Sequence, residues 1–183
     1  MTESYVPSSA GEHVYGGEAV VCLEGFLAES LAYGLLQVFG VRGPPVPVRD
    51  MIQVPHPAFG PLSLLELNLG LYDAAYRSLL NGSRLIVVDL DHPTVVQRAA
   101  MARELYVAFC CSRRADELDW PDREAPRGGS AYFARCLLMP AAWVKHIAAG
   151  SGSVEELAAI FGVSSEMMAD RLRELGIESD SPR

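Results

Sequence analysis

The chain has 183 residues and a formal charge of −8, and 50% of its residues are hydrophobic while 21% are charged. This length suits one full domain with a core of its own, and the composition excludes global disorder. The acidic balance gives no overall attraction to nucleic acid or to an anionic membrane surface. The N-terminus has no basic region followed by an apolar core, so we expect no signal peptide. The four cysteines show no paired spacing, which predicts reduced thiols in a cytoplasmic protein.

The first third of the chain predicts an arm, a long helix and an extended connection. Residues 1–17 are polar and predict a flexible N-terminal arm. Residues 18–39 have apolar positions at helical spacing and predict a buried helix, since Glu24 and Glu29 make a membrane span costly. The dense prolines of residues 43–61 exclude a helix or a central strand in this passage, and we expect an extended connection along the surface.

The middle of the chain predicts strands followed by a central helix. Leu62–Leu71 is compatible with a strand or a short helix, and Arg84–Asp89 predicts a strand after the Asn81-Gly82 turn. A helix is expected from Pro93 to about Arg114, capped by Asp91 or His92. The charged stretch over residues 116–129 predicts an exposed loop, and residues 130–138 and 143–148 predict two further helices.

The last part of the chain carries two adjacent helix signals. Ser153 and Glu156 have the spacing of a capping box, and Gly162 predicts a turn. Ser164 then caps a second helix that ends at Gly176. This order predicts a helix-turn-helix-like tail over residues 151–177, followed by a loose C-terminus over residues 178–183.

The central helix contains a short segment that corresponds to a zinc-peptidase motif without its ligands. In an HExxH motif two histidines four residues apart bind one zinc ion, and the glutamate beside the first histidine acts as general base on the metal-bound water. Here Glu104 stands at the base position, whereas Arg103 and Val107 stand at the ligand positions. Arginine stays protonated and valine has no donor atom, so neither can bind the metal.

Several segments together resemble the ImmA/IrrE family of zinc-dependent peptidases, formerly classed as a domain of unknown function. The matching segments are Gln97-Arg98 with Ala102, Glu104 and Leu105, then residues 133–140, 158–164 and 171–176. The resemblance covers about half of the chain, from about residue 84 to residue 177. It implies an α+β, zincin-like fold in which a small sheet of about three strands packs on the motif helix.

The resemblance also places the family's three zinc ligands at positions 103, 107 and 129. These are occupied by Arg103, Val107 and Gly129, none of which can bind zinc, so Glu104 would have no metal-bound water to deprotonate. A rebuilt site could recruit some of four other residues near the central helix, namely His92, Cys111, Asp116 and Glu117. Alternatively, the guanidinium of Arg103 could fill the former metal position and hold a carboxylate, or lie in solvent.

The tail is a poor match to a DNA-reading module. A recognition helix needs donors to base edges at its start and phosphate contacts around it. The second tail helix instead opens with Glu166, and the first carries Glu155 and Glu156. This composition favours a structural or protein-contacting role.

The sequence predicts a degenerate metallopeptidase-like domain over residues 18–150, with the tail packed on it. The leading hypothesis is a catalytically inactive ImmA/IrrE-like protein without metal or other cofactor, which binds a partner protein such as a helix-turn-helix repressor. The first alternative is an active zinc metallopeptidase with relocated ligands, and the second is a DNA-binding transcriptional regulator. The four positions Arg103, Glu104, Val107 and Gly129 are expected to be vestigial. We expect no membrane association.

Overall fold

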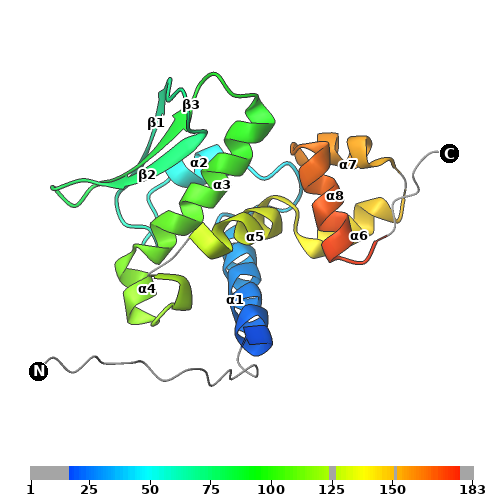
Figure 1. Ribbon diagram of the computed structural model, residues 1–183, viewed down its shortest axis with the longest axis horizontal. Helices are drawn as coiled ribbons and strands as arrows, with labels where there is room; N and C mark the ends of the chain where they lie inside the picture. The colour runs from blue at the N-terminus through cyan, green and yellow to red at the C-terminus, as the bar shows by residue number, and fades with distance from the viewer. Residues whose placement is uncertain (1–16, 124–126, 151, 178–183) are drawn as a thin grey trace, which may run out of the picture.

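The computed structural model describes residues 17–123, 127–150 and 152–177, and the predicted N-terminal arm and loose C-terminus lie outside these ranges except for Gly17. The chain forms a three-stranded sheet at one edge of the molecule, with the helices beside it (Figure 1). The elements are α1 (Gly17–Val38), α2 (Val48–Gln53), β1 (Leu62–Leu67), β2 (Ala74–Ser78), β3 (Arg84–Asp89), α3 (Thr94–Cys110), α4 (Arg113–Glu117), η1 (Pro121–Arg123), α5 (Arg127–Leu138), α6 (Ala141–Ala148), α7 (Val154–Phe161) and α8 (Ser165–Glu174). The predicted α+β class with a small sheet on helices is confirmed.

The sheet has the strand order β1-β3-β2, with β1 parallel and β2 antiparallel to β3. In this register Leu64, Ile86 and Tyr76 lie side by side on one face. Helices α2 and α3 pack against the strands, and Figure 1 shows both on the same side of the sheet. Because β2 is an edge strand, its outward amide groups need partners other than a neighbouring strand.

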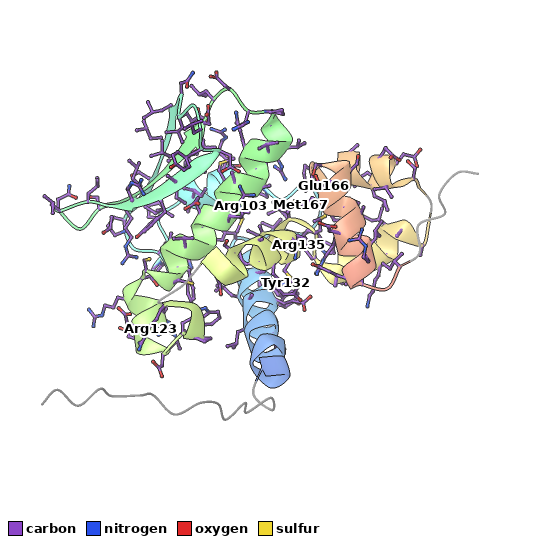
Figure 2. The ribbon with its side chains drawn as sticks, viewed as in Figure 1. Arg103, Arg123, Tyr132, Arg135, Glu166 and Met167 are labelled. Carbon is purple, nitrogen blue, oxygen red and sulfur yellow. The ribbon has the colours of Figure 1, made fainter. Side chains whose placement is uncertain are left out.

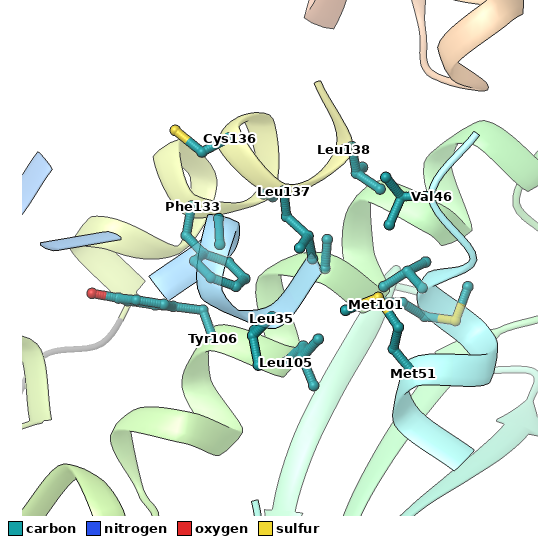
Figure 3. Close-up of a cluster of buried hydrophobic side chains, with 14 of the residues drawn as sticks. Leu35, Val46, Met51, Met101, Leu105, Tyr106, Phe133, Cys136, Leu137 and Leu138 are labelled. Carbon is teal, nitrogen blue, oxygen red and sulfur yellow. The ribbon is translucent and has the colours of Figure 1, made fainter. Parts of the chain in front are cut away.

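Helix α3 is the central element of the core. It packs against the sheet, α2 and α5, and its C-terminal half is buried on nearly every side. Figure 3 shows how side chains from four helices meet beside it: Met101 and Leu105 of α3, Phe133 and Leu137 of α5, Leu35 of α1 and Met51 of α2. A helix enclosed in this way holds its side chains in fixed positions, which suits a helix that carries a functional motif.

Four sequence-based expectations need correction. The proline-dense passage contains α2, because the seven residues between Pro47 and Pro55 include Val48, Met51 and Ile52 at helical spacing and bury all three. The central helix ends at Cys110 rather than near Arg114, and Ser112 caps the separate helix α4. The expected loop over residues 116–129 therefore includes the end of α4, η1 and the start of α5. Finally, Pro93 precedes α3 without a side-chain cap, so neither expected capping residue has that role.

The tail helices α7 and α8 form a compact pair. Ser153 and Glu156 make the predicted capping box, and Gly162 ends α7 in the left-handed conformation with φ 64°. Ser164 caps α8 by accepting a hydrogen bond from the Met167 amide. The pair is joined to the rest of the chain by polar contacts, one of which runs from Arg98 Nε of α3 to the Gly162 carbonyl at 2.9 Å.

Within the described ranges, no helix combines the length and the apolar composition that crossing a membrane requires.

Candidate functional site

The motif positions of α3 lie where this helix faces strand β2 and helix α5. Arg103 points toward the loop before β2 and forms an ion pair with Asp73. About a third of each side chain is exposed, so the pair lies at the edge of the core rather than inside it. Of the two alternatives for Arg103, contact with a carboxylate is the one observed, and its partner Asp73 lies 30 residues away in the sequence.

Glu104 lies inside the protein, with only 3% of the residue exposed. Its Oε2 accepts a hydrogen bond of 2.9 Å from the Tyr76 amide of strand β2. The pairing register directs that amide away from β3, toward the outer edge of the sheet. The carboxylate of Glu104 therefore satisfies a backbone N–H donor of the edge strand.

The other two ligand positions offer no electron pair to a metal. Val107 is 6% exposed and belongs to the apolar core. Gly129 lies half-buried in the first turn of α5 and has no side chain. Zinc in proteins is bound by cysteine sulfur, histidine nitrogen or carboxylate oxygen, so the residues at positions 103, 107 and 129 do not fit this ion.

The proposed replacement ligands are not brought together. Among the described residues, no group of three or more histidine, cysteine, aspartate or glutamate side chains is placed to hold a metal. Glu117 is engaged with Arg113 at 3.0 Å and Arg114 at 3.3 Å. Cys111 is an exposed residue at the C-cap of α3.

A small groove of about 230 Å³ lies between α3, α5 and α8. Its lining includes Arg103 and Arg135 together with Glu166 and Asp170, and Figure 2 shows the first three near one another. Both arginines are already paired, Arg103 with Asp73 and Arg135 with Glu174 at 2.6 Å. The cations that line the groove beside α3 are therefore largely neutralised.

Arg171 is a structural residue that sequence reasoning did not identify. It is 1% exposed, and its Nε donates to the Met139 carbonyl at 3.1 Å. Its Nη1 donates to Glu174 at 3.1 Å and its Nη2 to Glu29 of α1 at 3.4 Å. One guanidinium thus joins α8 to the end of α5 and to α1.

The fold defines a class of protein: a small mixed three-stranded sheet packed against helices, with the buried Glu104 on the central helix α3. Comparison with known families agrees. The profile of the IrrE N-terminal-like domain matches residues 61–173, so the chain belongs to that family. This confirms the ImmA/IrrE resemblance found in the sequence.

A solved structure described as a Mycobacterium tuberculosis transcriptional regulator is similar to this chain, with a TM-score of 0.57 and 18% sequence identity. The alignment covers 79% of this chain and 46% of that one. At this identity the likeness concerns the fold, and the chain spans less than half the length of its neighbour. No curated protein sequence matches the chain significantly.

Proposed function

We propose that this chain is a catalytically inactive member of the ImmA/IrrE family that acts as a protein-binding regulatory module. The observation that carries the proposal is the engagement of the motif helix in structural contacts. Arg103, at the first ligand position, pairs with Asp73, and the carboxylate of Glu104 bonds to the Tyr76 amide. A general base needs a metal-bound water within hydrogen-bond reach, and the neighbouring side chains do not supply metal ligands.

The partner class that we propose is a helix-turn-helix repressor. Active members of the ImmA/IrrE family cleave such repressors. A chain that keeps the fold without the zinc ligands would bind the repressor without cutting it. The transcriptional-regulator description of the structural neighbour is compatible with a role in gene regulation. Membership of the family is what supports this partner class.

Contacts of the tail argue against the DNA-binding alternative. Arg171 is buried among protein partners, so its guanidinium is not available to a phosphate. Arg173 forms a 2.7 Å ion pair with Asp170 on the same helix. DNA binding depends on exposed cations that can displace counterions. Arg171 does not provide one, and the exposed Arg173 is already paired with a carboxylate of its own helix.

The proposal is tested by mixing the purified chain with purified helix-turn-helix repressors from the same genome. Binding is measured by isothermal titration calorimetry, and the repressor is then examined by intact-mass spectrometry with zinc added or with a chelator. We expect saturable binding and an uncut repressor in both conditions. Cleavage that requires zinc and is abolished by Glu104→Gln would establish the active-enzyme alternative instead.

A further inference from the structure

Helix α1 presents a second row of side chains that does not belong to the core. Phe26, Ser30, Tyr33 and Gln37 follow one another at intervals of three or four residues, so they share one face of the helix. The core-facing residues of α1, such as Ala32, lie on the opposite face. Phe26 is 66% exposed and Tyr33 is 62% exposed, which leaves two aromatic rings accessible on the surface.

The row forms one wall of a groove with a volume of about 530 Å³. The opposite wall is the start of α6, where Pro140, Ala141 and Trp143 line the space, and Cys136 of α5 also lines it. Burial raises the pKa of the Cys136 thiol to about 11, so this sulfur stays protonated at neutral pH and is a poor nucleophile. The groove is therefore suited to non-covalent binding.

Among the residues that the structure describes, Glu29 is the only charged one that lines this groove. Its carboxylate pairs with the buried Arg171 at 3.4 Å, and Arg171 also pairs with Glu174 at 3.1 Å. Glu174 is in turn shared with Arg135 at 2.6 Å. Nearly half of the Glu29 side chain is exposed, so it can accept a second cation from outside. Aromatic rings attract cations through their faces, and the net charge of −8 favours approach of a basic partner.

We propose that this groove binds a basic amphipathic helix of a partner protein. A lysine or arginine of that helix would contact Glu29, and its apolar side chains would pack between Phe26, Tyr33 and Trp143. From Phe26 to Gln37 the row spans about 16 Å at the helical rise, which corresponds to about three turns of a bound helix. A helix docked in a groove uses anchors at this spacing, and aromatic residues contribute strongly to such interfaces. The inference rests on the proposed function in that it assumes a protein partner.

The test uses three synthetic peptides of about four helical turns with a fluorescent label. The first has leucines on one face and lysines on the other, the second has glutamates in place of the lysines, and the third has the composition of the first in an order without an apolar face. Binding to the full chain is followed by anisotropy. We expect saturable binding of the first peptide alone, weakened at higher salt.

Groove variants locate the binding site. We expect Glu29→Lys and Tyr33→Ala each to weaken binding of the basic peptide about tenfold, which corresponds to about 1.4 kcal/mol. Ile160→Ala, which removes an exposed apolar side chain of α7 outside the groove, is the matched control and should leave binding unchanged. Circular dichroism verifies that each variant is folded. Binding that is equal for the basic and acidic peptides, or unaltered by both groove variants, would refute the inference.

The same variants separate this inference from the proposed function. If the repressor binds the wild-type chain and both groove variants equally, the groove is not the binding surface and the inference fails, while the proposed function stands. If no repressor binds but the basic peptide still binds and depends on Glu29, the partner class is wrong and the groove assignment stands.

Discussion

Replacement of Arg171 by alanine should destabilise the protein far more than replacement of its neighbour Arg173. Arg171 is buried and donates to the Met139 carbonyl, Glu174 and Glu29, whereas the Arg173 side chain is 75% exposed. Both residues are arginines of α8, so the two variants lose the same atoms from different environments. Arg173→Ala is the matched control.

The magnitude follows from the groups that Arg171→Ala leaves behind. The Met139 carbonyl at the end of α5 loses its charged donor, and an unsatisfied buried acceptor costs about 1–3 kcal/mol. Breaking a buried ion pair costs about 3–5 kcal/mol, but Glu174 and Glu29 are partly exposed and recover hydration. We therefore expect a loss of about 3 kcal/mol, against at most about 0.5 kcal/mol for Arg173→Ala.

Urea unfolding followed by circular dichroism measures these free energies, and calorimetry gives the corresponding Tm. For a chain of this size we expect Arg171→Ala to lower Tm by about 6–12 °C and Arg173→Ala by no more than about 2 °C. Equal effects of the two variants would show that the guanidinium of Arg171 does not join α8 to α5 and α1 in solution.

Three further predictions concern stability. Glu104→Ala leaves the Tyr76 amide of the edge strand without its acceptor and should lower the free energy of unfolding by about 2–3 kcal/mol, as measured by urea unfolding. Glu104→Gln keeps an acceptor oxygen and should lower it by about 1 kcal/mol. Equal losses for the two variants would contradict the hydrogen bond between Glu104 and Tyr76. Gly162→Ala and Gly176→Ala both place a side chain at positive φ, but only at Gly162 would the new Cβ lie 3.2 Å from Arg98. Gly162→Ala should therefore destabilise the protein by about 1 kcal/mol more than Gly176→Ala. A larger loss for Gly176→Ala would refute this prediction. Burial raises the pKa of Cys136 to about 11 in the folded state, so the protonated thiol contributes fully to the free energy of unfolding below pH 9. This contribution, at most about 2–3 kcal/mol, is lost as pH rises toward 11. Urea unfolding across this pH range should show a smaller loss of stability for Cys136→Ala than for the wild type, and an equal loss would exclude Cys136 as its source.

Local sequence patterns predicted the parts of the fold that local chemistry determines. The apolar run after the Asn81-Gly82 turn indicated β3, and apolar residues at helical spacing indicated the long α1. The spacing of Ser153 and Glu156 predicted the capping box that opens α7. Gly162 was expected as a turn residue, and its φ of 64° explains why glycine is favoured there. These features depend on residues close together in the sequence.

The features that sequence reasoning missed depend on distant pairs. A lone arginine beside Leu172 in a helix is normally solvent-exposed, and the burial of Arg171 follows only from the approach of α5 and α1. The pairing of Arg103 with Asp73 joins residues separated by a turn and two strands. Helix α2 was missed because the prolines on either side dominate the local pattern. In each case tertiary packing overrides the local preference.

From the sequence, the candidate site could be judged only by the lack of side chains that can donate an electron pair to a metal at positions 103, 107 and 129. The residue types at positions 103, 107 and 129 were readable, but the new partners of Arg103 and Glu104 were not. The structure adds that both side chains are engaged by β2 and the loop before it. This engagement gives a physical reason for the expected inactivity.

The most direct measurement is the zinc content of the full chain, purified without chelators and dialysed against metal-free buffer, by inductively coupled plasma mass spectrometry. Because the residues at the three ligand positions do not fit the ion, we expect far less than one zinc per chain, with no change in Tm when zinc is added. About one tightly bound zinc per chain, together with a zinc-dependent rise in Tm, would contradict the account.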